Sequence, residues 1–211
     1  MRTAVAVAMI VVLAGCQKAD QSPNAKVTAA EGATKGNVTS LADFEVGLPQ
    51  GWTVFDLAAK DFEKIVAEWA KKDPKNAQLA DPLRAVASQG QIKLMAFDFA
   101  PADKTFTDNL NVIVVPAPPG GTLEQLSEAS AGQLKQIASG PVKMGKGSYN
   151  GQEYGTADYG MGSGNQPKLA VKCYFTVKNN KAYTFTFTSL ASRATAFQAQ
   201  AETAMASVSL K

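Results

Sequence analysis

The chain has 211 residues, of which 45% are hydrophobic and 18% are charged, and its formal net charge is +3. This composition is typical of a globular protein with a sizeable core. The charge is too small for the basic surface of a nucleic-acid-binding domain, so we expect no nucleic-acid partner. The chain contains no histidine, which excludes histidine-based catalytic triads and removes the commonest metal ligand.

The first fifteen residues have the layout of a secretory signal. Arg2 precedes an apolar run that extends from Ala4 to Leu13. Ten helical residues span about 15 Å, whereas a membrane-spanning helix needs about 20 residues. The run is therefore too short for a permanent membrane span, and it predicts an export signal.

The signal ends in Leu13-Ala14-Gly15-Cys16, which resembles the lipobox of bacterial prolipoproteins. The resemblance implies that residues 1–15 are removed and that the Cys16 thiol carries a diacylglyceryl group, with the new amino end usually acylated. Two or three acyl chains would form a lasting membrane anchor. The alternative is an ordinary signal peptide with a coincidental cysteine. In enteric lipoproteins an aspartate after the cysteine favours the inner membrane, so Gln17 slightly favours the outer membrane, facing the periplasm.

Residues 17–40 contain no aromatic residue, leucine or isoleucine and are rich in small polar residues, which predicts a flexible linker. A linker of this length has a typical reach of about 27 Å. We therefore divide the chain into a signal peptide (1–15), a lipidated cysteine with its tether (16–40) and one folded domain (41–211).

The first half of the domain alternates between strands and helices. Two short strands, 44–48 and 53–55, flank a turn at Pro49. A helix over 58–72 is predicted from the helical spacing of Phe62, Ile65, Val66 and Trp69. A short helix over 82–88 would follow, with Asp81 as its cap. The strands 92–99 and 110–115 are apolar on both faces, which is typical of central strands. Thr122 and Gln125 form a capping box for a helix that ends at Gly140.

The second half predicts four strands in succession and a closing helix. The strand 142–149 leads to Asn150-Gly151, a strong hairpin signal, and the chain returns along 152–159. Asn179-Asn180 can turn between the strands 169–177 and 182–189. The closing helix has an apolar stripe, with Ser192 as its cap; the stripe comprises Phe197, Ala201, Met205 and Val208. This order predicts an α+β fold, in which helices pack on the faces of a mostly antiparallel sheet.

Several segments of the domain together resemble the PsbP-like superfamily, or Mog/PsbP fold, which includes bacterial DcrB-type lipoproteins. The segments are Leu48-Pro49-Gln50-Gly51-Trp52, Asn109 to Val114, Leu123-Glu124-Gln125-Leu126, Tyr149 to Tyr154, Val177 to Thr188 and the helix with Phe197. The resemblance implies an α/β/α sandwich whose sheet is covered by helices on both faces. Its members include a photosystem II subunit, a Ran-binding import factor and envelope lipoproteins, which implies a role in binding and assembly. Histidine-mediated metal contacts of the photosystem members cannot be carried over to this chain.

The candidates for chemistry outside Cys16 have plain structural interpretations. Cys173 is in phase with the apolar residues of its strand, which predicts a buried small hydrophobe rather than a reactive thiol. The aspartates Asp98, Asp103 and Asp108 could hold Ca²⁺, but loop aspartates usually form turns. Glu63 and Glu68 do not share a helix face, so they do not predict a glycosidase pair.

Glycines and aromatic residues are the remaining candidates. The run Gly160 to Asn165 matches no phosphate-binding fingerprint and predicts a mobile hairpin, which could still contact a partner. Trp52 and Trp69 are expected in the core. Tyr149, Tyr154 and Tyr159 could form an aromatic strip, either as packing or as an exposed contact site.

From these observations we expect a membrane-anchored envelope lipoprotein that acts as a non-enzymatic binding or assembly module. We expect no catalytic residue, no metal site and no cofactor. Its partners would be the membrane, through lipid on Cys16, and an envelope protein that the sequence does not name. Two alternatives remain open: a carrier of a small molecule or lipid, and a cell-wall enzyme that works without histidine.

Overall fold

The computed structural model describes residues 37–100 and 106–211. The predicted signal peptide, Cys16, most of the predicted tether and Asp103 lie outside the described residues. Within the described residues, no helix is long and apolar enough to span a membrane.

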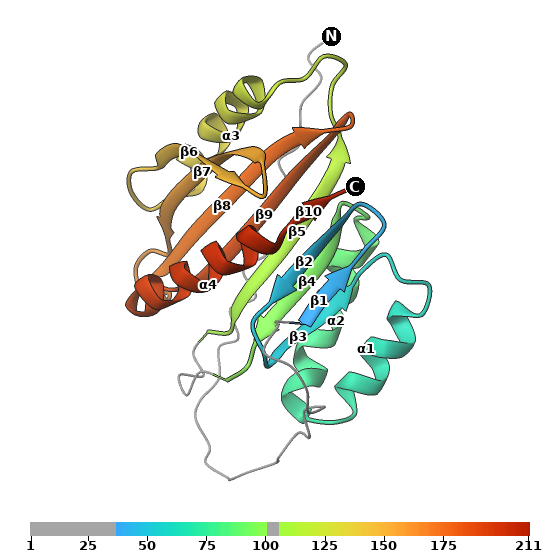
Figure 1. The fold of residues 1–211 in the computed structure, drawn as a ribbon. Helices are drawn as coiled ribbons and strands as arrows, with labels where there is room; N and C mark the ends of the chain where they lie inside the picture. The colour runs from blue at the N-terminus through green and yellow to red at the C-terminus, as the bar shows by residue number, and fades with distance from the viewer. Residues whose placement is uncertain (1–36, 101–105) are drawn as a thin grey trace.

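The described residues form two antiparallel sheets and four α-helices (Figure 1). The larger sheet has seven strands in the order β3-β4-β5-β9-β8-β7-β6, and the smaller has the order β1-β2-β10. In chain order the elements are β1 (Asn37–Ser40), β2 (Phe44–Leu48), β3 (Trp52–Asp56), α1 (Phe62–Ala70), α2 (Pro74–Ser88), β4 (Ile92–Asp98), β5 (Asp108–Pro116), α3 (Leu123–Ile137), β6 (Lys143–Tyr149), β7 (Gln152–Met161), β8 (Leu169–Lys178), β9 (Lys181–Leu190), α4 (Ala194–Ser207) and β10 (Ser209–Leu210).

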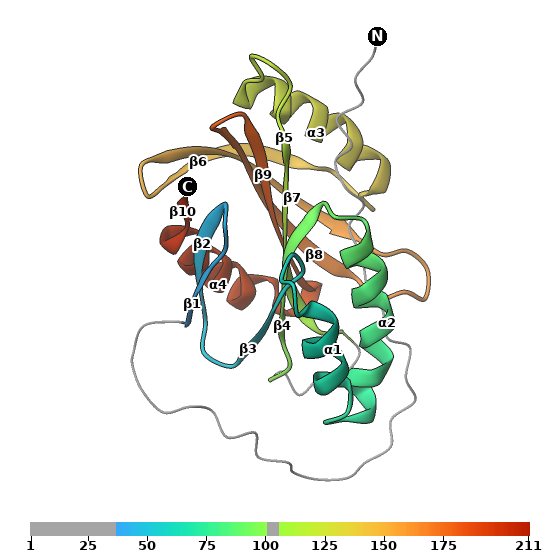
Figure 2. The same ribbon diagram turned by 90° about the vertical axis from the view of Figure 1, so that its right-hand side faces the viewer.

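The seven-stranded sheet has a different layer on each face (Figure 2). On one face, α1 and α2 pack near β3–β5, and α3 packs over β7 and β8. On the other face lie α4 and the small sheet, whose strand β2 contacts α4. This arrangement confirms the predicted α+β fold, with helices on both faces of an antiparallel sheet.

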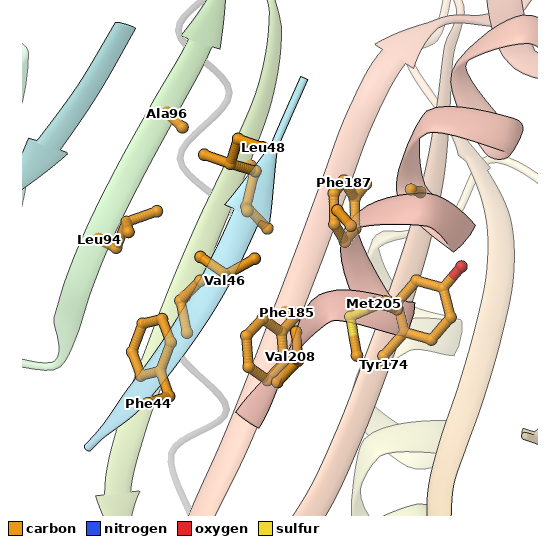
Figure 3. Packing of buried hydrophobic residues seen from close by; sticks show 14 of the residues in the cluster. Phe44, Val46, Leu48, Leu94, Ala96, Tyr174, Phe185, Phe187, Met205 and Val208 are labelled. Atoms are coloured by element: carbon orange, nitrogen blue, oxygen red, sulfur yellow. The ribbon is translucent and has the colours of Figure 1, made fainter. Parts of the chain in front are cut away.

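The core on the α4 face is rich in aromatic residues, because alternate positions of β8 and β9 point into it. Phe185 and Phe187 of β9 lie beside Tyr174 of β8, and β2 contributes Phe44 (Figure 3). The rings of Phe44 and Phe185 meet edge to face, with centroids 5.6 Å apart. Such pairs stabilise a core beyond the area that they bury, and here they join the small sheet to the large one.

Both tryptophans pack against aromatic rings. Trp52 is buried and stacks on Phe197 of α4 at 6.2 Å, as expected for a core residue. Trp69 is partly buried and meets Phe55 edge to face at 4.9 Å. Ile65, which the helical spacing assigned to the apolar stripe, is instead 40% exposed, because α1 is short and buries only Phe62 and Val66.

The second helix differs from the prediction. It begins at Pro74 rather than Pro82, so Asp81 is not its cap and instead forms an ion pair with Arg84. Proline suits the first position of a helix, and inside a helix it removes one backbone hydrogen bond. The helix continues through Pro82 because Ala80, Leu83 and Val86 are buried in the core.

Three further elements also differ from the prediction. Residues 37–40, assigned to the tether, form β1, and β10 was not predicted. Both strands pair with β2, so their presence depends on tertiary contact rather than on their own sequence. Ser192 is not the cap of α4, because a 3₁₀ turn over Ala191–Arg193 precedes that helix.

The predicted turns and the capping box are confirmed. Asn150 and Gly151 have φ values of 51° and 76°, and Asn179 and Asn180 have φ values of 50° and 57°. These left-handed conformations match the twist of a two-residue hairpin. Thr122 caps α3: its hydroxyl oxygen accepts a hydrogen bond from the Gln125 backbone N–H, and its own backbone N–H donates to Oε1 of Gln125.

Gly155 of β7 provides a test of the packing under α3. A Cβ atom at this position would lie 2.2 Å from Cε2 of the buried Phe175 ring. We expect Gly155→Ala to lower the free energy of unfolding by about 1–3 kcal/mol, because an overpacked core must shift. Urea denaturation of the purified protein measures the change.

Gly132→Ala is the matched control, because nothing lies within 4 Å of the added Cβ in the middle of α3. It should raise the free energy of unfolding by about 0.5–1 kcal/mol, since alanine favours helix more than glycine does. Equal stability of the two variants would contradict the packing described for β7 and β8.

Candidate functional site

A network of charged and hydroxyl side chains lies where α4 packs on the large sheet. Its centre is the carboxylate of Glu202, on α4. The Tyr149 hydroxyl donates to Oε2 of this carboxylate at 2.5 Å, and the Tyr174 hydroxyl donates to Oε1 at 2.9 Å. Lys172 Nζ lies 2.9 Å from the same Oε1 and 3.7 Å from Oδ1 of Asp158. We call these five residues the Glu202 network.

Strand register places two members of the network, Asp158 and Lys172, beside Lys143 of the edge strand. Lys143, Asp158 and Lys172 are directly opposite one another on β6, β7 and β8, so they form one row across the sheet. Tyr174 is two residues beyond Lys172 and therefore points to the same face. The row alternates in sign from the edge of the sheet inward, which is a favourable arrangement of cross-strand neighbours.

Burial and hydrogen bonding fix the protonation states of Tyr149, Tyr174 and Glu202. Burial, followed by the contact with Glu202, raises the pKa of Tyr149 to about 12, and the same causes raise the pKa of Tyr174. Burial alone would raise the pKa of Glu202, but the hydrogen bonds from Lys172, Tyr149 and Tyr174 outweigh it and lower that pKa. At neutral pH the carboxylate is therefore charged, and both phenols are neutral donors.

These protonation states suit a network that holds α4 in position rather than one that catalyses a reaction. A general acid or base works best with a pKa near the operating pH, whereas the tyrosine and glutamate pKa values of this network are moved away from neutrality. The network therefore acts as a polar clamp that holds α4 on β6 and β8.

The structure describes two of the three aspartates that were considered as Ca²⁺ ligands, Asp98 and Asp108. Asp98 and Asp108 are opposite each other on β4 and β5. However, Asp108 accepts from Nη2 and Nε of Arg193, with its Oδ1 2.5 Å from Nη2. An arginine in this position takes the place that a cation would need. Within residues 37–100 and 106–211, no group of three or more potential metal ligands is found.

The two glutamates of the first helix do not face each other. Glu63 forms an exposed ion pair with Arg84 at 2.9 Å, and Glu68 is exposed on α1. Both side chains belong to the solvated surface of α1.

Cys173 is buried, as predicted. Burial raises the pKa of its thiol to about 11, so the thiol stays protonated at neutral pH. The sulfur donates to Oγ1 of Thr186 at 3.5 Å and lies 3.8 Å from the Tyr159 hydroxyl. A protonated and enclosed thiol is a packing group rather than a nucleophile.

The three tyrosines of the expected aromatic strip do not share one face. Tyr149 and Tyr154 pack edge to face at 5.7 Å on the α4 side. Tyr159 lies in the cluster under α3, on the opposite face, because it is five residues after Tyr154 and side chains alternate along a strand.

A small apolar pocket lies between α3 and the ends of β5, β8 and β9. Its volume is about 50 Å³, and it is lined by Ala117, Pro118, Gly121, Thr122, Gln125, Leu126, Ala129, Val177 and Ala182. Typical ligand sites have volumes of about 300 to 1,000 Å³. The pocket has room for one small apolar group, and it gives little support to the carrier alternative.

Comparison with solved structures identifies the fold. The solution structure of cyanobacterial PsbP from Synechocystis sp. PCC 6803 is similar with a TM-score of 0.54, at 15% sequence identity over 88% of this chain and 98% of that one. LpqN of Mycobacterium tuberculosis, described as involved in cell envelope biogenesis, is similar with a TM-score of 0.51, at 10% identity over 83% of this chain and 85% of that one. No protein-family model matches the chain, and no curated protein does either. The chain therefore has the PsbP-like fold, as the sequence resemblance predicted.

The Glu202 clamp can be tested by its effect on stability. We expect Glu202→Ala to lower the free energy of unfolding by about 1–2 kcal/mol at pH 7, because charge-assisted hydrogen bonds are lost at a partly exposed site. The folded state lowers the pKa of Glu202 from its ordinary value of 4.5. The stabilisation is therefore present above pH 4.5 and is lost as the pH falls through the folded-state pKa. In urea denaturation at decreasing pH, the difference in free energy of unfolding between the wild type and Glu202→Ala should therefore become smaller.

Glu128→Ala is the matched control, because Glu128 is an exposed glutamate on α3. Substitutions of this kind change stability by less than about 0.5 kcal/mol. If both variants behave alike at pH 7, Glu202 does not clamp α4.

Proposed function

We propose that this protein is a lipid-anchored module of the bacterial cell envelope that works by binding and assembly rather than by catalysis. The observation that carries the proposal is the PsbP-like fold of the described residues, attached to a chain start that resembles a lipoprotein signal.

The proposed membrane location depends on Cys16. The lipobox Leu13-Ala14-Gly15-Cys16 follows an apolar run that is too short to span a membrane, so lipid on the cysteine would supply the anchor. The similar protein LpqN is involved in cell envelope biogenesis, which supports an envelope location. Gln17 favours the outer membrane in this proposal.

Lipidation is tested by substitution of the cysteine. In a bacterial host, Cys16→Ser should abolish labelling by radioactive palmitate and move the protein from the membrane fraction to the soluble fraction, because a thioether link needs a thiol. Cys173→Ser is the control, since this buried cysteine lies inside the domain, and that variant should keep both the label and the membrane location. Labelling that persists in Cys16→Ser would refute the anchor.

The binding role is tested by crosslinking the lipidated protein in intact membranes. We expect an envelope protein to be recovered with the wild type. Turnover of a cell-wall substrate by the purified protein, with no partner recovered, would overturn the proposal in favour of an enzyme.

A further inference from the structure

The strand β6 forms one edge of the seven-stranded sheet, and no described strand pairs with its outer side. The two-residue turn at Asn150-Gly151 makes Tyr149 and Gln152 a hydrogen-bonded pair. In an antiparallel ladder such pairs alternate with non-hydrogen-bonded ones. Gly147, Gly145 and Lys143 therefore bond to β7, and the N–H and C=O groups of Met144, Lys146 and Ser148 point outward.

The side chains around this edge are also accessible. Residues 143–146 of β6 are all exposed, including Met144 at 39%. On the α4 side, Gly145 and Gly147 have no side chains, and the ring of Tyr149 lies beside Gly147. The edge is a regular strand with free backbone groups, and a second strand has room to approach it.

Charge indicates what kind of strand fits. On the α4 face, the row that runs inward from the edge reads Lys143, Asp158, Lys172, so a carboxylate opposite Lys143 would continue the alternation of sign. On the α3 face, Lys146 has only a long contact of 3.4 Å with Glu124, and both side chains are more than half exposed. A carboxylate opposite Lys146 can displace that contact at little cost.

We propose that the outer edge of β6 binds an extended segment of an envelope partner that carries two carboxylates three residues apart. The two lysines are three residues apart, so they lie on opposite faces of the strand. A paired segment would place one carboxylate against each lysine, while its backbone bonds to Met144, Lys146 and Ser148. This inference rests on the proposed binding function and specifies its site and the chemistry of the partner.

A second copy of the chain fits this edge less well. An antiparallel pairing of two β6 strands that uses all three outward residues would place Lys146 directly opposite Lys146. Like charges in that position are destabilising. The edge therefore favours an acidic segment over a copy of itself.

The test uses the lipidated protein in detergent micelles and two synthetic peptides. The first peptide has eight residues of alternating threonine and valine, with glutamate at its third and sixth positions. The second has lysine at those positions. Fluorescence anisotropy measures the affinity, and hydrogen exchange locates the bound segment. We expect the acidic peptide to bind at least tenfold more tightly and to slow exchange in residues 143–149.

Two variants separate pairing from charge. Lys146→Pro removes an outward N–H that β7 does not use, and a proline is tolerated on an edge strand with its N side to solvent. The preceding Gly145 leaves room for the proline ring. This variant should weaken the acidic peptide at least tenfold. The double variant Lys143→Glu and Lys146→Glu keeps every N–H and should reverse the preference, so that the lysine peptide binds more tightly.

Several results would overturn the inference: no binding of the acidic peptide, equal binding of both peptides, full binding by Lys146→Pro, or slower exchange elsewhere, such as around the apolar pocket at α3. Recovery of a second copy of the chain as the molecule paired on β6 would overturn it as well. The proposed function has its own readout. If Lys146→Pro still captures its envelope partner by crosslinking in membranes, the β6 site is wrong and the binding module stands.

Discussion

Two tight turns fix the register on which the rest of this structure depends. Asn150-Gly151 and Asn179-Asn180 adopt left-handed backbone conformations that two-residue hairpins require. They fix β6 against β7 and β8 against β9. A slip of one residue would send every side chain of a strand to the opposite face. Tyr174 and Phe185 would then leave the α4 core, and Cys173 would no longer be enclosed beneath α3.

Register also explains why charged groups lie so close to the aromatic core. Lys172 and Tyr174 share one face of β8, so a lysine sits beside the rings and its Nζ lies 5.4 Å from the Tyr174 centroid. A half-buried charge is costly unless it is paired. Glu202 provides the partner, and two phenols complete its hydrogen bonds. Burial of the apolar stripe stabilises the packing of α4 on the sheet, and the Glu202 network fixes the position of α4 along the sheet.

Features that depend on residues close in the chain were predicted correctly from the sequence, whereas features that depend on tertiary contacts were not. Turn chemistry, the Thr122 capping box and the apolar stripe of α4 gave the meander, two helices and the fold class, since each depends on residues close in the chain. The strands β1 and β10 exist only through β2, and α2 continues through Pro82 only because its apolar face is covered. The Glu202 network was missed because no tight turn sets β7 against β8; a loop of seven residues, 162–168, joins them. Without that register, Asp158 and Lys172 cannot be placed in one row.

The lysines of β6 can both protect an exposed edge strand from unwanted pairing and favour an acidic partner. A bare edge strand invites pairing with any other strand, and lysine is a common protection against it. Protection of this kind is selective, because a segment with matched carboxylates gains the cross-strand attraction that a neutral or basic segment lacks. In the proposed lipid-anchored form, the tether would confine the domain to the membrane surface and so raise the effective concentration of a membrane-bound partner. Under that proposal, strand pairing that is too weak to persist in dilute solution would suffice for assembly in the envelope.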